Sequence, residues 1–112
     1  MLTEEEYVER ASVELKSLLT ALDQIDEDAI EAELANDILT IELGADAPPI
    51  VVNSHRAARQ IWMAADHSAW HFDWDDKARA WIAPKNGDEL WGTLGARLGR
   101  RLGRELVLGR AS

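Results

Sequence analysis

Six carboxylates fall within eleven consecutive positions in the first third of the chain. No lysine or arginine lies between Lys16 and Arg56, so basic side chains close in sequence do not neutralise them. Carboxylate oxygens are hard ligands that suit iron, manganese, calcium or magnesium. We expect these side chains to be exposed and to bind metal weakly, at several partly solvated positions rather than in a preformed cage. The predicted metal ligands are Asp23, Asp26, Glu27, Asp28, Glu31 and Glu33.

The charge of the whole chain allows a second interpretation of the same residues. The sequence holds 21 acidic and 12 basic residues, a formal net charge of −9, and residues 1–46 alone hold 14 acids and 2 bases. A segment this acidic repels phosphate backbones, which argues against nucleic acid as a partner. It attracts cations or a basic protein surface, but it also makes a well-solvated face that binds nothing. The sequence alone leaves these alternatives open.

A second set of candidate residues combines an amide with an aromatic ring. Gln60 and Trp62 alternate with Ile61 and Met63 in a segment of strand character. If Ile61 and Met63 face the core, Trp62 faces solvent, and an exposed tryptophan beside polar groups is typical of an interface anchor. The alternative is that Trp62 lies under a loop.

Composition and spacing exclude several kinds of enzyme site. Because the chain has no cysteine, it offers no thiol nucleophile and no cysteine ligands for zinc or an iron–sulfur cluster. His55, His67 and His71 lack the HxxxH and HExxH spacings of zinc enzymes. No motif marks a Ser-His-Asp set or a buried pair of carboxylates. We therefore predict a protein without catalytic residues and without an organic cofactor.

The acidic cluster follows a segment with a helical pattern. Its apolar residues recur at steps of three and four, which puts one stripe on one helix face. Thr3 is placed to cap this helix, and Glu6, three residues later, completes a capping box. The stripe consists of Val8, Ala11, Leu15, Leu18 and Leu22.

From residue 30 the hydrophobic period changes to two, which indicates β-strands. The hairpin predicted over 30–43 turns at Asn36-Asp37. It puts Glu31 and Glu33 together on its solvated face, roughly 6.5–7 Å apart. Further short strands are predicted at 50–52, 60–64, 69–73 and 79–83.

A second helix is predicted from about Asp88, with Gly103 as its C-terminal cap. We expect the glycines along it to allow close packing against the sheet or the first helix. Its arginines complement the negative end of the helix dipole, and residues 106–108 form either a last short strand or an extended tail. The glycines are Gly92, Gly95 and Gly99, and the arginines are Arg97, Arg100 and Arg101.

Short connections imply an antiparallel sheet, and two amphipathic helices need a sheet face to cover. The predicted fold class is α+β: a two-layer sandwich with two helices packed on one face of an antiparallel β-sheet of about six strands. No linker divides the sequence, so residues 1–112 are predicted to form a single domain. Because the sequence has no apolar run of membrane-spanning length and no signal peptide, we expect a cytoplasmic protein without a membrane partner.

Motifs in the second half of the chain carry a resemblance to a known family. With the order of elements, they are similar to the frataxin family of the bacterial CyaY type over nearly the whole chain. The acidic cluster falls where frataxins carry an acidic ridge. The motifs are Asn53, Gln60-Ile61-Trp62-Met63-Ala64, Trp70-His71-Phe72-Asp73, Trp81-Ile82 and Leu90-Trp91-x-x-Leu94.

This resemblance implies a frataxin-like fold and a non-enzymatic role in iron–sulfur cluster assembly. It implies that ferrous or ferric iron binds weakly and transiently at the acidic cluster. It also implies that the outer sheet surface of Asn53, Gln60 and Trp62 docks on a cysteine desulfurase and an iron–sulfur scaffold protein. A monomer is expected, with iron-dependent oligomers as a further state.

Two roles remain open at this point. One is an iron donor or regulator of the desulfurase–scaffold complex. The other is an interaction module whose acidic ridge docks on a basic partner, with metal binding incidental.

Overall fold

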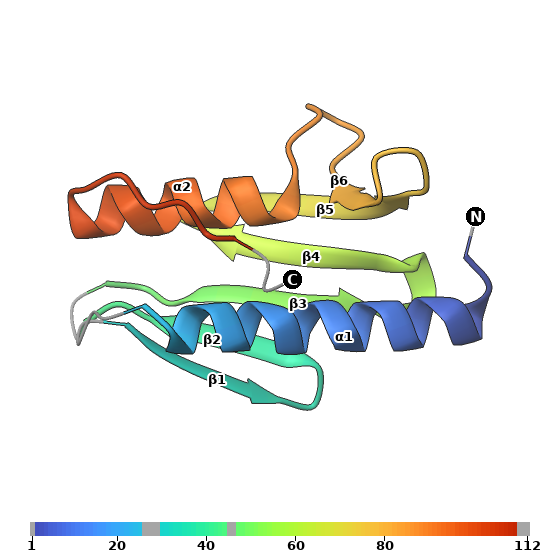
Figure 1. Cartoon of the computed structure of the whole chain (residues 1–112), viewed down its shortest axis with the longest axis horizontal. Coiled ribbons are helices and arrows are strands. Elements are labelled where there is room, and N and C mark those ends of the chain that lie inside the picture. Colours follow the sequence, from blue (N-terminus) through green and yellow to red (C-terminus); the bar gives the residue numbers. More distant parts are fainter. Residues whose placement is uncertain (1, 26–29, 45–46, 110–112) are drawn as a thin grey trace.

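The computed structural model of the chain describes residues 2–25, 30–44 and 47–109. Its elements are α1 (Glu4–Asp23), β1 (Glu31–Ala35), β2 (Ile38–Glu42), β3 (Ile50–His55), a short 3₁₀ turn η1 (Arg56–Ala58), β4 (Gln60–Ala65), β5 (Ser68–Asp75), β6 (Ala80–Ile82) and α2 (Leu90–Leu102). The strands form one antiparallel sheet in the order β1-β2-β3-β4-β5-β6. Both helices lie over the same face of this sheet (Figure 1). The predicted two-layer α+β sandwich is confirmed.

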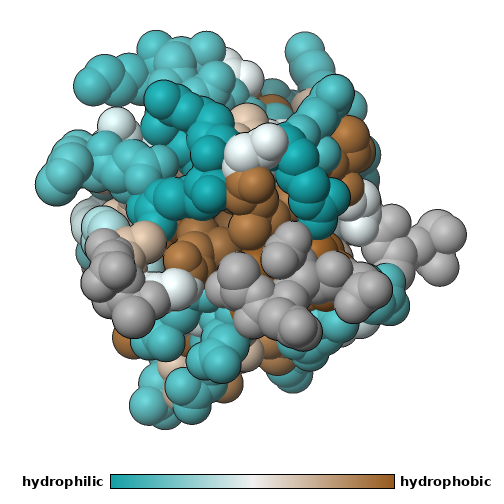
Figure 2. Space-filling model, turned by 90° about the vertical axis from the view of Figure 1, so that its left-hand side faces the viewer, coloured by the Kyte–Doolittle hydropathy of each residue, from teal (hydrophilic) through white to brown (hydrophobic). Residues whose placement is uncertain are grey.

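The core fills the space between the helices and the inner face of the sheet. Ile61, Met63 and Phe72 are almost completely buried there, as are Leu15 and Leu18 of α1. This matches the period of two in the strands and the stripe along the first helix. The core comes close to the surface where both helices end, since hydrophilic side chains there surround an apolar area (Figure 2). We call the sheet face turned away from both helices the open face.

The length and hydropathy of the helices in the described ranges bear on whether either could span a membrane. Neither α1 nor α2 is both long enough and apolar enough to cross a membrane.

Helix α1 starts as its sequence predicts. The Thr3 hydroxyl accepts a hydrogen bond from the Glu6 backbone N–H at 3.1 Å, and the Thr3 backbone N–H donates to Glu6 Oε1 at 3.0 Å. The hydrogen bond from the Thr3 backbone lowers the pKa of the Glu6 carboxyl. One turn later the buried Tyr7 hydroxyl donates to the Gln60 carbonyl at 2.7 Å, which joins α1 to β4, and burial raises the pKa of this tyrosine. The two hydrogen bonds between Thr3 and Glu6 confirm the predicted capping box.

Two of the hairpins close through two-residue turns of the same kind. Asn36 and Asp37 join β1 to β2, and Asp66 and His67 join β4 to β5. All four residues have positive φ angles, between 51° and 67°. This geometry is that of a type I′ turn, whose twist matches that of the strands it connects. The predicted turn at Asn36-Asp37 is confirmed.

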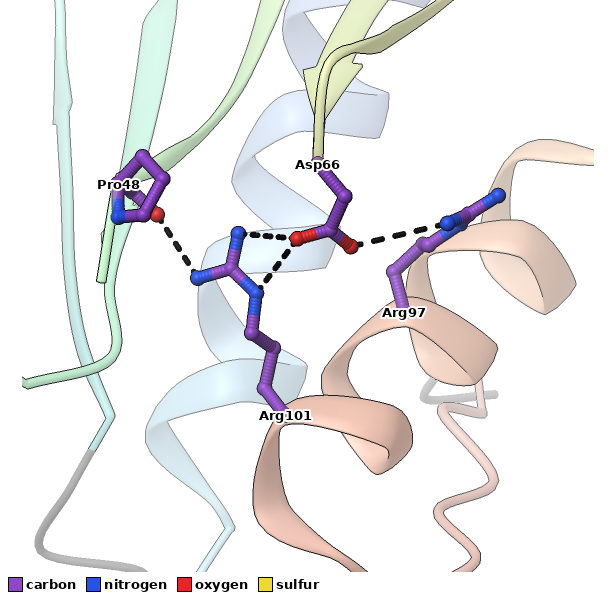
Figure 3. Close-up of polar contacts among 4 residues, drawn as sticks. All are labelled: Pro48, Asp66, Arg97 and Arg101. Atoms are coloured by element: carbon purple, nitrogen blue, oxygen red, sulfur yellow. Dashed lines mark hydrogen bonds and ion pairs between the residues drawn. The ribbon is translucent and has the colours of Figure 1, made fainter.

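Asp66 also ties helix α2 to the sheet (Figure 3). The Arg101 guanidinium donates from Nε to Asp66 Oδ1 at 2.8 Å and from Nη1 to the Pro48 carbonyl at 2.8 Å. Arg97 approaches the other carboxylate oxygen, with Nη1 3.7 Å from Oδ2. These arginines therefore hold a β-turn and the segment before β3, a more specific task than complementing the helix dipole.

Asp66→Asn is expected to lower the free energy of unfolding by about 1–2 kcal/mol, because it leaves the mostly buried Arg101 without its charged partner. Asparagine tolerates the positive φ of this turn, so the change isolates the charge. Urea denaturation measures the effect. The control is Asp37→Asn, the same substitution in the other type I′ turn at an exposed side chain. Equal losses of stability in Asp66→Asn and Asp37→Asn would show that the contact between Asp66 and Arg101 does not hold α2 to the sheet.

Gly95 and Gly99 of α2 face the C-terminal tail, residues 104–109, and not the sheet or α1. A Cβ atom built on Gly99 would lie 2.6 Å from the Arg104 carbonyl oxygen, and one on Gly95 would lie 3.2 Å from the Leu106 carbonyl oxygen. The predicted packing partner of these glycines is therefore wrong. The tail is extended and folds back along α2 after Gly103, whose φ of 71° confirms it as the C-cap.

Candidate functional site

The hairpin of β1 and β2 carries a set of carboxylates at one edge of the sheet. Glu31 and Glu33 are exposed on the open face, while Ala32 and Leu34, which alternate with them, are partly buried. The shared face of Glu31 and Glu33 is therefore confirmed. The strand register places Glu42 directly opposite Glu31. Like charges directly opposite each other repel, so this pair favours a bound cation.

Asp23 joins these carboxylates from the end of α1. It is the last residue of the helix and is exposed, and the last helical turn holds no basic residue. One hollow at the sheet edge is lined by Asp23 together with Glu31, Glu33 and Glu42. We call these four residues the acidic edge. The other predicted ligands, Asp26, Glu27 and Asp28, lie outside the described residues.

The acidic edge is open and carries unpaired charge. Within residues 2–25, 30–44 and 47–109, none of its four carboxylates forms an ion pair with a basic side chain. In the same ranges, no three acidic or histidine side chains come close enough together to hold a metal ion. The geometry therefore attracts cations and basic surfaces without enclosing an ion.

The centre of the open face is occupied by Trp62. Ile61 and Met63 are buried at 0% and 1% exposure, so the predicted direction of Trp62, away from the core, is confirmed. The side chain is only partly exposed, however. His55 stacks on one of its faces, with ring centroids 3.7 Å apart, and His71 stacks on the other at 4.2 Å. Neighbouring strands supply both rings, because Trp62 on β4 pairs with His71 on β5, and His55 on β3 lies two residue pairs along the register from Trp62.

Hydrogen bonds fix the orientation of the Trp62 indole through its ring N–H group. The Trp62 indole N–H donates to Gln60 Oε1 at 2.8 Å, and Gln60 Nε2 donates to Asp73 Oδ1 at 3.0 Å. Because Asp73 accepts from the amide nitrogen of Gln60, it orients the amide oxygen toward the indole. Asn53 pairs with Trp62 across β3 and β4. The structure therefore brings the predicted residues Asn53, Gln60 and Trp62 together on one face.

Three contributors to these surfaces were missed in the sequence. Glu42 follows from the predicted hairpin, since the Asn36-Asp37 turn sets the register that places it opposite Glu31. Along the chain, His55 and His71 are separated by fifteen residues and no local motif relates them to Trp62. Their relation to Trp62 runs across strands, and it depends on the register of β3 with β4.

Sequence and structure comparisons agree on one family. The sequence model of the frataxin-like domain matches residues 1–104. A protein of Variovorax paradoxus named iron-sulfur cluster assembly protein CyaY is 29% identical, over 94% of this chain and 96% of its own length. A protein of the same name from Neisseria meningitidis serogroup B is 34% identical over 84% of each chain. A solved frataxin from Psychromonas ingrahamii matches with a TM-score of 0.81 and 16% identity, over 97% of this chain and 100% of its own, which shows the shared fold. The chain therefore belongs to the frataxin-like family, with relatives of the CyaY type.

Proposed function

We propose that this protein takes part in iron–sulfur cluster assembly without catalysing a reaction itself. In this proposal it carries iron at the acidic edge and docks on a cysteine desulfurase and its scaffold protein, as an iron donor or as a regulator. The part of the proposal that concerns iron–sulfur cluster assembly is supported by relatives that are named iron-sulfur cluster assembly protein CyaY. The observation that carries the proposal is that Glu31, Glu33 and Glu42, which form no ion pair within the described residues, share the open sheet face with Trp62.

Iron is the cargo in this proposal, and the acidic edge supplies oxygen ligands for it. Carboxylates accept ferrous and ferric iron and other hard cations with little selectivity when they are not held in a fixed geometry. The exposed positions of Asp23, Glu31 and Glu33 leave much of the ion hydrated. Weak binding suits a carrier, because the ion can leave again when an acceptor offers better ligands.

Docking uses the two parts of the open face differently. Exposed charges act over a Debye length of about 8 Å and raise the rate at which a basic partner associates. A tryptophan that becomes desolvated in an interface slows dissociation. The acidic edge is therefore assigned to steering, and Trp62 with Asn53 and Gln60 to holding the complex together.

A second candidate function is an interaction module that binds metal only incidentally. One observation favours it: no chelating group of three side chains forms in the part of the chain that the structure describes. Electrostatic steering needs only the summed negative charge of the edge, whereas an iron site needs ligands around one point. The two functions differ in whether iron and the partner perturb the same residues.

Changing Glu31 and Glu33 together to lysine is expected to weaken ferrous iron binding by about tenfold or more without unfolding the protein, because both side chains are exposed. Two-dimensional NMR titrations with ferrous iron and with the desulfurase measure both functions. The matched control, Glu9→Lys with Glu105→Lys, makes the same change in net charge at exposed positions away from the edge. Paramagnetic broadening centred on His55, His67 or His71 would contradict the acidic edge as the iron site.

A further inference from the structure

The three stacked rings on the open face form a unit that iron binding does not use. The His55 and Trp62 ring planes are inclined by 12°, and the Trp62 and His71 planes by 13°. Each histidine therefore lies flat on the indole. Histidine is the side chain type that ordinarily changes its charge between pH 5 and 8. The residue proposed to hold the partner thus has a group of variable charge on each face.

The inner ring nitrogen of His55 shows that the uncharged form fits this stack. Its Nδ1 atom is buried and has no hydrogen-bond partner within the described residues. A neutral imidazole tolerates this when its proton is on Nε2. A second proton would have to sit on Nδ1, where it has no acceptor, and a buried charged donor without a partner costs free energy. Protonation therefore places a positive charge in the stack, at a nitrogen that has no acceptor within the described residues.

The charged groups around the stack are already engaged elsewhere or point into solvent. Asp73 of β5 accepts the hydrogen bond from Gln60, and Arg56 after β3 pairs with Glu4 at 3.1 Å. Asp75 of β5 accepts two backbone N–H groups of the following turn. The other titratable groups nearby are Asp37 of the β1–β2 turn and Tyr7 of α1 behind the sheet. No hydrogen bond within the described residues joins any of them to an imidazole of the stack, so a charge gained there acts on the open face.

We propose that His55 and His71 make the docking face pH-sensitive, because a proton gained by either imidazole places a positive charge directly against a face of Trp62. The inference rests on the proposed function, in which the acidic edge selects a partner with a basic surface. New positive charges on the same face repel that surface. Acidification therefore releases the partner.

The experiment measures affinity for the desulfurase–scaffold complex at pH 8 and pH 6. For the native chain the dissociation constant is expected to rise by about tenfold on acidification. For His55→Gln with His71→Gln it is expected to rise by no more than about twofold, since glutamine stays neutral. Titration of the partner affects both proteins equally, so the difference between them belongs to the stack. His67→Asn is the control, because His67 is exposed in the β4–β5 turn and asparagine tolerates its φ of 67°; it should behave as the native chain.

A second measurement does not need the partner. The NMR signal of the Trp62 indole N–H should shift between pH 5 and 8 in the native chain and should stay constant in the double variant. If the chemical shift of the Trp62 indole N–H does not change between pH 5 and 8, the inference is overturned even if docking occurs. A titrating indole with the same tenfold loss of affinity in the double variant would overturn the switch and leave the proposed docking intact. Absence of binding at both pH values would reject the docking function and the switch together.

Discussion

Replacing Gly99 by alanine is expected to lower the free energy of unfolding by about 2 kcal/mol, although alanine is the better helix former. The added methyl group would lie 2.6 Å from the Arg104 carbonyl oxygen and 3.2 Å from the Leu106 backbone nitrogen. Both neighbours are backbone atoms of the C-terminal tail, so the tail has to move away from α2. Leu108, which is 8% exposed in the core, then loses part of its burial. Thermal or urea unfolding measures the loss.

The other glycines of α2 provide a graded control for this effect. Gly95→Ala meets the tail at 3.2 Å and is expected to cost less than Gly99→Ala. Gly92 is exposed, and its nearest neighbour is the flexible Glu89 side chain at 3.5 Å. Gly92→Ala is therefore expected to stabilise the protein by up to about 1 kcal/mol. If all three variants were equally stable, the close approach of tail and helix would be wrong.

Trp62→Ala is expected to weaken docking on the desulfurase–scaffold complex by about 2 kcal/mol, or roughly thirtyfold in the dissociation constant. The change should appear mainly in the dissociation rate, because the association rate depends on the distant charges of the acidic edge. The fold should survive, since the side chain lies on the open face and the neighbouring Ile61 and Met63 keep the core filled. Binding kinetics at two salt concentrations, with circular dichroism as a folding check, test this expectation.

Two comparisons make the tryptophan result specific. Val13→Ala removes an apolar side chain that is 57% exposed on α1, away from the open face, and should leave the kinetics unchanged. Iron binding should also be nearly unchanged in Trp62→Ala, because the acidic edge lies on β1, β2 and the end of α1. A slower association rate with an unchanged dissociation rate would assign Trp62 to steering and contradict its role as anchor.

Local patterns were sufficient to predict the elements and the faces they present. The alternation around Glu31 and Glu33, together with a turn that accepts positive φ at both central residues, fixes the hairpin and its register. The capping box of Thr3 and Glu6 likewise spans only four residues of sequence. Strand β3 was predicted too short, since Asn53–His55 pair with β4 without apolar alternation.

Contacts between distant segments were harder to predict. The missing Cβ of Gly99 indicates a close approach, but it does not identify the approaching segment, and the tail was not the expected one. The stack of His55 on Trp62 depends on how η1 and Arg59 turn the chain between β3 and β4. Arg59 has a positive φ of 53°. This conformation could not be predicted from the residue type, because positive φ is uncommon for residues other than glycine.

Strand β1 ends the sheet order, so one side of its backbone is not paired with another strand of the described sheet. Such an edge is a template on which a second copy of a protein can add its own strand, and charged side chains are a common protection against this. Glu31 and Glu33 provide that protection here, in a strand of five residues. An ion that neutralises them removes the repulsion between two such edges. If iron binds at the acidic edge as proposed, cargo loading and self-association are linked through the same two side chains, and solubility then depends on how much cargo the protein carries.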